Sequence, residues 1–312
     1  VSDKRIINGF GHYAYLKISE GCDRNCSFCA IPLIKGKYIS RQIDDIYYEA
    51  LNLAAAGVKE IILIAQDLSF YGKDLLGKSM LPDLVNKLSS IDKIKWIRLH
   101  YLYPNTFPDE ILDIMRDNQK VCSYLDIPLQ HASDDVLKKM RRGSSKEEIE
   151  KILKTAREKV PDIALRTTMM TGHPGEGEKE FEELLDFVKK WKFERLGVFT
   201  YSEEEGTYGA KKFEDNIAEE IKQSRADRLM EEQQNISEEL NLKKIGKRLK
   251  VIVDGREGKS LICRSEYDSV EVDNEILVST DENFEPGTFI DVEIISASEF
   301  EMQGKLIGVY ND

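Results

Sequence analysis

Three cysteines lie within eight residues near the start of the chain. Cys22, Cys26 and Cys29 are separated by three and then by two residues. Thiolates at this C-x3-C-x2-C spacing can bind one iron–sulfur cluster from a single loop. Because the loop supplies only three ligands, one iron of a [4Fe–4S] cluster would have no cysteine nearby. The spacing therefore predicts a cluster with one open iron, at which a cofactor can bind.

A structural zinc ion is the alternative for these thiols, with a distant His or Cys as the fourth ligand. Zinc patterns of this kind usually pair two C-x2-C segments, and the sequence contains no second one. The cluster is therefore the favoured interpretation. The other two cysteines, Cys122 and Cys263, each lie at a predicted strand and are interpreted as small buried apolar side chains. The histidines are far apart in the sequence, at His12, His100, His131 and His173.

The composition indicates a globular chain of more than one domain. The 312 residues include 45 Lys or Arg and 57 Asp or Glu, which gives a net charge of −12. This length exceeds that of one ordinary hydrophobic core, so we expect two domains. No apolar run approaches the ~20 residues that span a bilayer, and residues 1–10 contain no apolar signal-peptide core. We therefore expect a cytoplasmic protein that does not enter a membrane.

The first two thirds of the chain alternate short β-rich runs with amphipathic helical stretches. This alternation predicts a parallel sheet whose site lies at the carboxyl ends of the strands. Six such units are fewer than a full barrel has, so we expect an open (β/α)6 partial barrel over residues 1–215. The predicted strands are 13–19, 59–65, 96–102, 123–128, 164–171 and 196–201, and the predicted helices are 41–56, 81–91, 109–118, 134–141, 146–159 and 178–191.

The last third of the chain has a different pattern. Residues 216–246 are highly charged with helical spacing and are predicted to form a connecting helix. From residue 247 to residue 312 the apolar residues recur at every second position, between turns rich in Gly, Asp and Asn. This pattern predicts a small all-β barrel as the second domain.

The cysteine motif, with an aromatic residue before its last cysteine and a six-unit β/α chain behind it, resembles the radical S-adenosylmethionine (SAM) superfamily. Other segments narrow the resemblance to the methylthiotransferases. The C-terminal barrel resembles the OB-like TRAM module of the same enzymes, so the resemblance covers nearly the whole chain. The segments that carry it are 31–41, 66–67, 128–142, 171–178 and 199–207.

The resemblance implies a cofactor set and a reaction. In this superfamily the open iron of a [4Fe–4S] cluster binds SAM, an external donor supplies an electron, and a 5′-deoxyadenosyl radical abstracts a hydrogen atom. Methylthiotransferases also carry an N-terminal domain in which three more cysteines hold a second [4Fe–4S] cluster. The chain begins just before the first core strand, so we expect it to lack that domain and to be unable to complete methylthiolation alone.

Specific residues are assigned by this resemblance and by their places at strand ends. Cys22, Cys26 and Cys29 are expected to hold the cluster. No residue is assigned as a catalytic acid or base, because the radical would abstract the hydrogen. We interpret His131 as a hydrogen-bonded residue of the pocket wall. The candidate SAM contacts are Phe28, Gln66, Gln130, Ser133, Arg166 and Tyr201.

Three of these candidates have a structural alternative. Phe28 could be part of the core, because a buried aromatic ring does not need a ligand. Arg166 could form an ion pair with an internal carboxylate such as Asp126. Ser133 could cap the helix that begins after it.

Charge favours one of two substrate classes. Methylthiotransferases modify either an adenosine of tRNA or the β-carbon of an aspartate in a small-subunit ribosomal protein, whether free or within the ribosome. Residues 247–312 contain seven Lys or Arg and fifteen Asp or Glu. Such an acidic domain suits a basic protein better than RNA phosphates, and Gln66 followed by Asp67 resembles the protein-modifying branch. A basic stretch at the domain junction keeps the tRNA alternative open, and a non-catalytic, metal-bearing module that binds ribosomes is the non-enzyme alternative.

Overall fold

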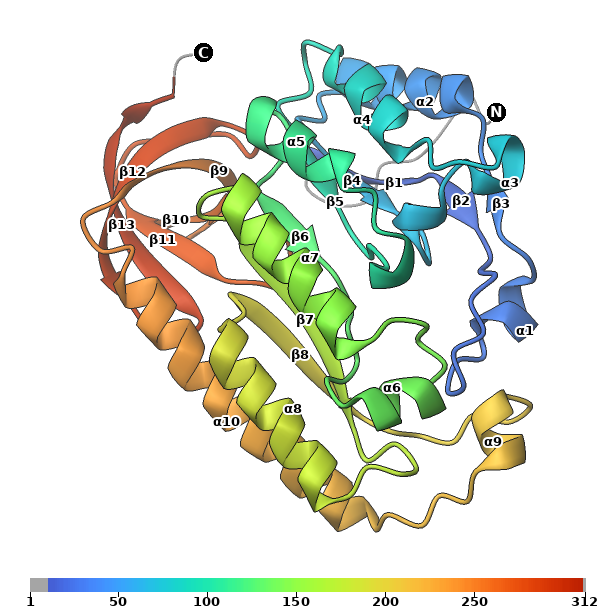
Figure 1. Cartoon of the computed structure of the whole chain (residues 1–312). Coiled ribbons are helices and arrows are strands. Elements are labelled where there is room, and N and C mark those ends of the chain that lie inside the picture. The colour runs from blue at the N-terminus through green and yellow to red at the C-terminus, as the bar shows by residue number, and fades with distance from the viewer. Residues whose placement is uncertain (1–10, 311–312) are drawn as a thin grey trace.

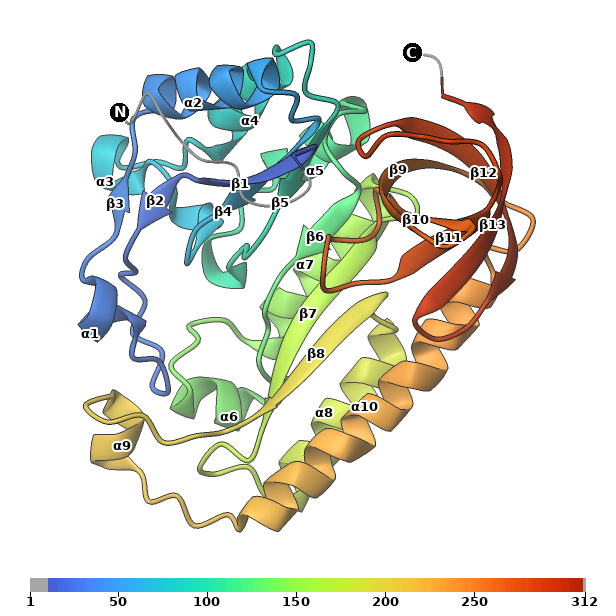
Figure 2. The same cartoon turned by 180° about the vertical axis from the view of Figure 1, so that it is seen from behind.

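The computed structural model describes residues 11–310, so the outer limits of both predicted domains and residues 1–10 lie outside the described residues. Figures 1 and 2 show a curved sheet with helices on its outer face and a small barrel at one end. Two sets of three parallel strands, in the order β1-β4-β5 and β6-β7-β8, form the sheet. The strands are β1 (Tyr13–Lys17), β4 (Glu60–Ile64), β5 (Trp96–Leu99), β6 (Tyr124–Asp126), β7 (Ala164–Thr171) and β8 (Arg195–Thr200).

The two sets of strands continue into one another at the middle of the sheet. Ile97 forms a parallel bridge with Val121, and the backbone N–H of Leu102 donates to the carbonyl oxygen of Asp126 at 2.9 Å. All six strands coincide with predicted ones. The open, six-stranded partial barrel predicted from the alternation is therefore confirmed.

Six helices cover the sheet where the apolar periodicity predicted them. Their apolar faces join one large core with the strands. The helix that begins at Lys146 has a capping box: Ser145 accepts from the backbone N–H of Glu148, and the Glu148 carboxylate accepts from the N–H of Ser145. The helices are α2 (Ile43–Ala55), α4 (Leu81–Ser89), α5 (Glu110–Asp117), α6 (Asp134–Lys139), α7 (Lys146–Lys159) and α8 (Glu178–Trp191).

Several short elements lie in loops that the sequence analysis left without structure. They are too short to show a period of apolar residues, so pattern analysis cannot detect them. Most of them lie near the cysteines or at the carboxyl ends of the strands. They are β2 (Ser19–Glu20), α1 (Ile31–Lys35), β3 (Ile39–Ser40), η1 (Leu68–Phe70), α3 (Lys73–Leu76), η2 (Pro104–Thr106) and α9 (Tyr208–Lys212).

The long helix α10 (Glu219–Leu242) leads from the core to a second unit and packs along β7, β8 and α8. The second unit is a closed barrel of five strands in the order β10-β11-β13-β12-β9, as the alternating pattern predicted. The exact domain limits at residues 215 and 246 stay a prediction. No helix within residues 11–310 is long and apolar enough to cross a membrane. The barrel strands are β9 (Arg248–Glu257), β10 (Ser260–Ser265), β11 (Glu275–Ser279), β12 (Phe289–Ala297) and β13 (Glu301–Val309).

The barrel closes the amino ends of the core strands. Its segment between β10 and β11, residues 266–274, is called the junction loop below. Val270 of this loop packs with Tyr13 and Ile62 of the core, and Ile252 of β9 packs with Trp96. The barrel and the cysteine motif therefore lie at opposite ends of the core strands.

Buried ion pairs join the two units at this end. Glu60, at the start of β4, accepts from Arg98 Nε at 2.8 Å and lies 2.7 Å from Arg264 Nη2 of the barrel. All three side chains are at most 2% exposed. Burial alone would raise the pKa of Glu60, but the guanidinium groups of Arg264 and Arg98 outweigh it and lower that pKa to about 2. The carboxylate is therefore charged whenever the protein is folded at neutral pH.

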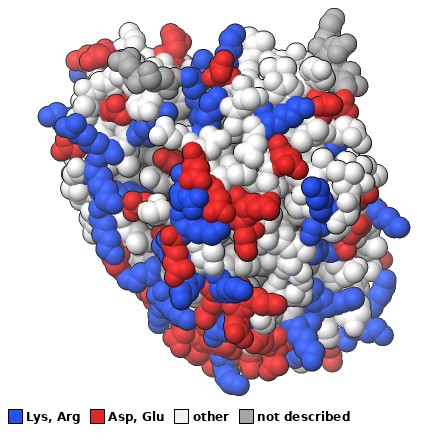
Figure 3. Space-filling view, turned by 45° about the horizontal axis from the view of Figure 1, so that its top comes forward, with Lys and Arg blue, Asp and Glu red and all other residues white. Residues whose placement is uncertain are grey.

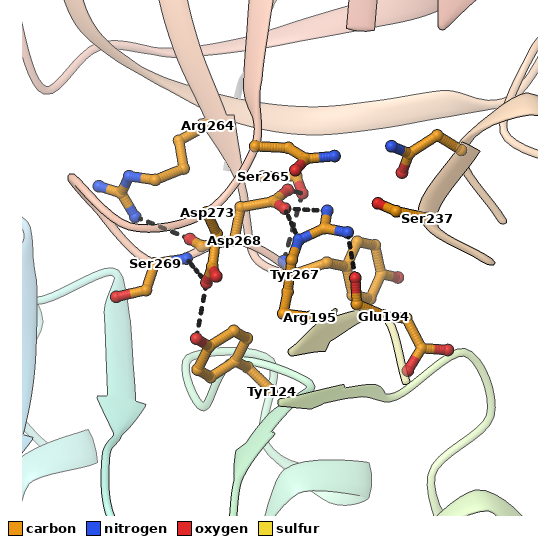
Figure 4. A network of polar contacts seen from close by, with 12 residues as sticks. Tyr124, Glu194, Arg195, Ser237, Arg264, Ser265, Tyr267, Asp268, Ser269 and Asp273 are labelled. Atoms are coloured by element: carbon orange, nitrogen blue, oxygen red, sulfur yellow. Dashed lines mark hydrogen bonds and ion pairs between the residues drawn. The ribbon is translucent and has the colours of Figure 1, made fainter. Parts of the chain in front are cut away.

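A second part of the junction lies at the amino ends of β6 and β8, below the barrel in Figure 4. The Tyr124 hydroxyl donates to Asp273 of the junction loop at 2.6 Å, and Arg195 forms a buried ion pair with Asp268. The Ser269 hydroxyl lies 2.9 Å from His100 Nε2. Since these partners all belong to the junction loop, one short segment fixes the barrel against three core strands.

Candidate active site

The cysteine motif lies in a loop whose two ends are joined by a short antiparallel pair, β2 and β3. Gly21 precedes the first cysteine and has a φ of +78°. A Cβ atom at this position would lie 2.1 Å from the carbonyl oxygen of Lys37, so only glycine fits. The backbone N–H of Cys22 donates to the carbonyl oxygen of Gly36 at 3.2 Å. The base of the cysteine loop (residues 21–36) is therefore narrow and defined by backbone contacts.

The three cysteines are uncombined and partly or fully buried. Burial raises the pKa of Cys22 to about 11, and the nearby side chains of Asp67, Cys26 and Cys29 add to the increase. Burial also raises the pKa of Cys29. Without a metal these two thiols are protonated at neutral pH, so iron binding must displace protons.

The arrangement fits a multi-iron cluster by its donor set. Within residues 11–310, no group of three or more His, Cys, Asp or Glu side chains could hold a metal ion as it stands. The ligands of one zinc ion must meet at a point, whereas each cysteine of a [4Fe–4S] cluster binds its own iron. Three thiols on one loop, with a buried cation beside them, supply the chemistry that such a cluster requires.

The middle of the cysteine loop is held by three distant segments through one residue. The N–H of Ser27 donates to the carbonyl oxygen of Met140 at 2.9 Å, and its own carbonyl oxygen accepts from the N–H of Gly209. Its hydroxyl lies 3.0 Å from His173 Nε2. Burial lowers the pKa of His173 to about 4, so the imidazole is neutral near pH 7. These contacts position the loop from the sides of α6, β7 and α9.

Two arginines lie against the ring of Tyr103 beside the cysteines. The guanidinium carbons of Arg24 and Arg142 are each 4.2 Å from the ring centre. Arg24 forms an ion pair with the buried carboxylate of Asp67 at 2.8 Å. Arg142 instead donates to Cys26 Sγ, at 3.5 Å, and to the carbonyl oxygen of Pro128. Both arginines therefore fix the surroundings of the cysteine loop.

A cavity of about 430 Å³ lies within the partial barrel. Gln66 follows β4 and contributes to its wall, together with Arg166 of β7. The side-chain oxygen of Gln66 is buried and has no hydrogen-bond partner. Since Asp67 binds Arg24 of the cysteine loop, the loop and the cavity are connected through two consecutive residues. The remaining lining residues are Tyr15, Lys17, Ile64, Ala65, His100, Tyr101 and Val272.

Arg166 is held by carboxylates on two sides. Its Nη1 donates to Asp126 Oδ1 at 3.1 Å, which is the internal ion pair considered in the sequence analysis. Its Nε lies 3.6 Å from Asp273 Oδ1 of the junction loop. The side chain is still 19% exposed and contributes to the cavity wall. An internal ion pair and a place in the cavity are therefore both present.

Phe28 and Tyr201, two of the predicted SAM contacts, lie elsewhere. Both rings pack edge-on against His173, at centroid distances of 6.4 and 5.2 Å. Tyr201 is 1% exposed, and Lys222 of α10 lies 5.4 Å from the centre of its ring. These two side chains surround the histidine that holds Ser27, and they do not line the cavity with Gln66.

Gln130 and Ser133 lie where the chain leaves β6. Gln130 has a φ of +76°, and its N–H donates to the carbonyl oxygen of Thr168. Ser133 is at the N-cap position of α6, but its side chain makes no capping hydrogen bond. Its N–H donates to His131 Nδ1, whose other ring nitrogen lies 3.2 Å from Glu176. His131 is thus buried and hydrogen-bonded, whereas its place in a pocket wall stays a prediction.

The sequence analysis missed four residues of the site: Ser27, Tyr103, Arg142 and His173. Each is far in sequence from the partner that gives it its place, so spacing alone could not indicate its role. Arg142 and His173 fall within the segments that carry the family resemblance, which was the available signal. Cys122 and Cys263 are 1% and 0% exposed, which confirms that they are buried.

Comparisons with known proteins agree with this geometry. The profile of the Radical SAM superfamily matches residues 16–188, and that of the TRAM domain matches residues 245–307. The chain is 52% identical to the ribosomal protein uS12 methylthiotransferase RimO of Bacteroides thetaiotaomicron over 308 residues, which cover 98% of this chain and 71% of that protein. The chain belongs to the radical SAM methylthiotransferase family. The corresponding RimO of Cytophaga hutchinsonii is 50% identical over 97% of this chain and 70% of its own length.

Solved structures show the same fold at low sequence identity. SuiB of Streptococcus suis, bound to S-adenosylmethionine, has a TM-score of 0.51 and 16% identity over 72% of this chain and 48% of that chain. Members of the radical SAM methylthiotransferase family are transferases that use a [4Fe–4S] cluster and SAM. The partial barrel and the TRAM barrel are the domains expected of this family.

Proposed function

We propose that this protein transfers a methylthio group to the β-carbon of an aspartate in a small-subunit ribosomal protein, by radical SAM chemistry. The proposal rests mainly on the 52% identity, over nearly the whole chain, with a uS12 methylthiotransferase. The contact between the cysteine loop and the cavity through Gln66 and Asp67 supports it, because SAM must reach both. We propose that the protein acts in the cytoplasm, where ribosomes are modified.

Each part of the site has a proposed task. Cys22, Cys26 and Cys29 would hold the cluster, which supplies the electron that cleaves SAM when it is bound. The amide of Gln66 and the guanidinium of Arg166 would bind polar groups of SAM in the cavity, since a guanidinium can donate two hydrogen bonds to a carboxylate. Gln130 and Ser133, which lie outside the lining of this cavity, would contact SAM from the exit of β6, and Phe28 and Tyr201 would support the cluster loop through His173.

The outer surface of the barrel supports a protein partner. The loop between β11 and β12 exposes acidic side chains, and β13 and the turn before it expose apolar ones. Acidic and apolar surface together suit a basic protein with an apolar contact area. On the face shown in Figure 3, acidic and basic side chains lie side by side, so the net charge does not form one continuous acidic area there. The exposed residues are Asp281, Glu282, Glu285, Phe300, Ile307 and Val309.

The source of the transferred sulfur is a separate requirement. The sequence has five cysteines, of which Cys122 and Cys263 are buried singly far from the motif, so it supplies only one three-cysteine set. The second [4Fe–4S] cluster of methylthiotransferases would therefore have to be held by other cysteines. We propose that this chain by itself cleaves SAM and binds the substrate protein, with the electron coming from an external donor.

Reconstitution of the cluster, followed by assays of SAM cleavage and of substrate binding, tests this proposal. After anaerobic reconstitution with iron and sulfide, the chain should contain about four irons and release 5′-deoxyadenosine when SAM and dithionite are added. It should bind the small-subunit ribosomal protein, with an affinity that falls as the salt concentration rises, because charge attracts the two proteins. Binding of tRNA in place of the ribosomal protein would contradict the proposed substrate, and the absence of SAM cleavage would contradict the proposed chemistry.

One observation favours tRNA as the second candidate substrate. Between α10 and the barrel lies a cavity of about 410 Å³ with several basic side chains in its wall. Asp162 and Glu194 also line it and reduce its positive charge. Phosphate groups bind such sites, with a strong dependence on salt. The binding experiment above compares both substrates. The basic lining residues are Arg157, Lys243, Lys244, Lys247 and Arg248.

A further inference from the structure

Arg142 is a buried cation without an acidic partner. The residue is only 5% exposed to solvent. No carboxylate within residues 11–310 forms an ion pair with it, although other buried arginines such as Arg98 and Arg195 have one. Its Nε is buried and has no hydrogen-bond partner. A buried charge without a counter-charge is strongly unfavourable, so this site requires an anion.

The contacts of Arg142 show where that anion would lie. Nη2 donates to the carbonyl oxygen of Pro128, and Nη1 donates to Cys26 Sγ at 3.5 Å. The ring of Tyr103 packs against the guanidinium, and the Tyr103 hydroxyl donates to the Arg142 carbonyl oxygen at 2.8 Å. These contacts fix the cation beside the second cysteine of the motif. The acidic partner of the neighbouring Arg24 is Asp67, so that carboxylate is already occupied.

We propose that Arg142 is the counter-charge of the [4Fe–4S] cluster and makes its one-electron reduction easier. Three thiolates and four sulfides give the cluster a net negative charge, and reduction by an external donor adds one more electron. A guanidinium that donates to a ligand sulfur stabilises the reduced form more than the oxidised form. Hydrogen bonds to the sulfurs and nearby charge are the means by which proteins set the potentials of such clusters.

The residue that precedes Arg142 in the chain provides a matched control. Arg141 is exposed, and its guanidinium lies over Tyr208 at 4.4 Å from the ring centre. The variants Arg142→Gln and Arg141→Gln remove the same charge from adjacent positions, one buried beside the cysteine loop and one in solvent. An exposed charge is screened by water and salt, so only the first substitution should affect the cluster strongly.

The test is a redox titration of the reconstituted protein without SAM or ribosomal protein, followed by the EPR signal of the reduced cluster. At a fixed ambient potential, R142Q should lower the ratio of reduced to oxidised cluster at least tenfold, which is 59 mV for a one-electron couple. R141Q should titrate like the unmodified protein. Equal titrations of R142Q and the unmodified protein, at equal iron content, would overturn the proposal.

A third variant separates charge from folding. Arg142→Lys keeps the charge and should retain most of the original potential, whereas a shift as large as that of R142Q would assign the effect to lost packing and overturn the proposal. If R142Q fails to retain iron while its iron-free form melts like the unmodified protein, the lost counter-charge has destabilised the cluster, as proposed. Because the readout is a potential, the result does not depend on the substrate proposed above.

Discussion

Asp273 Oδ1 of the barrel lies 3.6 Å from Arg166 Nε of the core, and the same carboxylate accepts from the hydroxyl of Tyr124. Arg166 also lines the cavity next to Gln66. The TRAM barrel thus contributes to the positioning of a cavity residue, although it lies at the opposite end of the strands from the cysteines. This arrangement makes the barrel part of the candidate active site.

Asp273→Asn should therefore weaken SAM binding from a distance. The substitution keeps an oxygen for Tyr124 but removes the charge beside Arg166, so the guanidinium is held less firmly. We expect the Kd for SAM to rise about three- to tenfold, as measured by calorimetry on the reconstituted protein. Asp268→Asn is the control, because Asp268 pairs with Arg195 and does not line the cavity. It should lower stability but leave the Kd of the folded protein unchanged, and equal effects on the Kd would contradict this role of Asp273.

Gln66→Ala should lower the affinity for SAM by about tenfold, which is the loss of roughly one hydrogen bond in a buried site. The buried side-chain oxygen of Gln66 has no partner in the protein, so a ligand in the cavity can supply one. Gln223→Ala, at an exposed position of α10, is the matched control and should bind SAM normally. An unchanged Kd for Q66A would remove Gln66 from the binding site.

Replacing any cysteine of the loop by Ala should abolish cluster assembly. Each of the three thiols is needed because a single loop supplies all the protein ligands. Iron content and the visible absorbance of the cluster, measured after anaerobic reconstitution, check this expectation. Cys263→Ala should keep the full iron content, since Cys263 lies in the barrel core, although it should cost about 1–2 kcal/mol of stability. A C26A protein that still held four irons would contradict the assignment.

Glu60→Gln should destabilise the protein by about 3–5 kcal/mol. It removes the carboxylate that lies between Arg98 and Arg264, which leaves the buried Arg98 without its ion pair and Arg264 with Asp254 alone. Urea unfolding followed by circular dichroism measures the loss. The exposed pair of Glu158 with Lys154 provides the comparison, and Glu158→Gln should change the stability very little. Similar small changes in both variants would mean that the buried pair does not stabilise the junction.

The stability of the iron-free protein should fall as the pH drops below 6.5. Burial lowers the pKa of His100 to about 3 and that of His173 to about 4, whereas an unfolded histidine has a pKa of 6.5. Below pH 6.5 the unfolded chain therefore binds protons that the folded protein excludes, and each histidine removes about 1 kcal/mol per pH unit.

Two comparisons isolate this effect. Glu60, whose pKa is lowered from 4.5 to about 2, contributes stability above pH 4.5 that is lost only as the pH falls toward 2. Unfolding measured between pH 7 and pH 5 therefore reports on the histidines. His100→Gln should make the pH dependence in this range shallower, and an identical slope would show that folding does not lower the pKa of His100.

The fold could be predicted from local pattern because its large elements have strong periodicity. The strand Glu60–Ile64 and the helix Glu178–Trp191 each bury a regular series of apolar residues, which a sequence displays directly. The barrel was predicted for the same reason, from alternation in strands such as Phe289–Ala297.

The site could be predicted only where its residues lie close together in the chain. The three cysteines form such a motif, whereas Arg142 reaches Cys26 across 116 residues and Ser27 reaches His173 across 146. Tertiary packing alone creates those contacts. Whether Phe28 and Tyr201 contact SAM stays a prediction, because their position near a cysteine or after a strand does not say which way the ring points.

The junction loop also has a consequence for the order in which the molecule is made. During translation, Glu60 and Arg98 are synthesised long before Arg264 and Asp273 leave the ribosome. Until then the amino ends of the core strands have no cover, and Arg166 lacks one of its two acidic partners. The cavity can therefore take its final shape only after nearly the whole chain has been synthesised, so a nascent core should not yet hold SAM as the finished protein does.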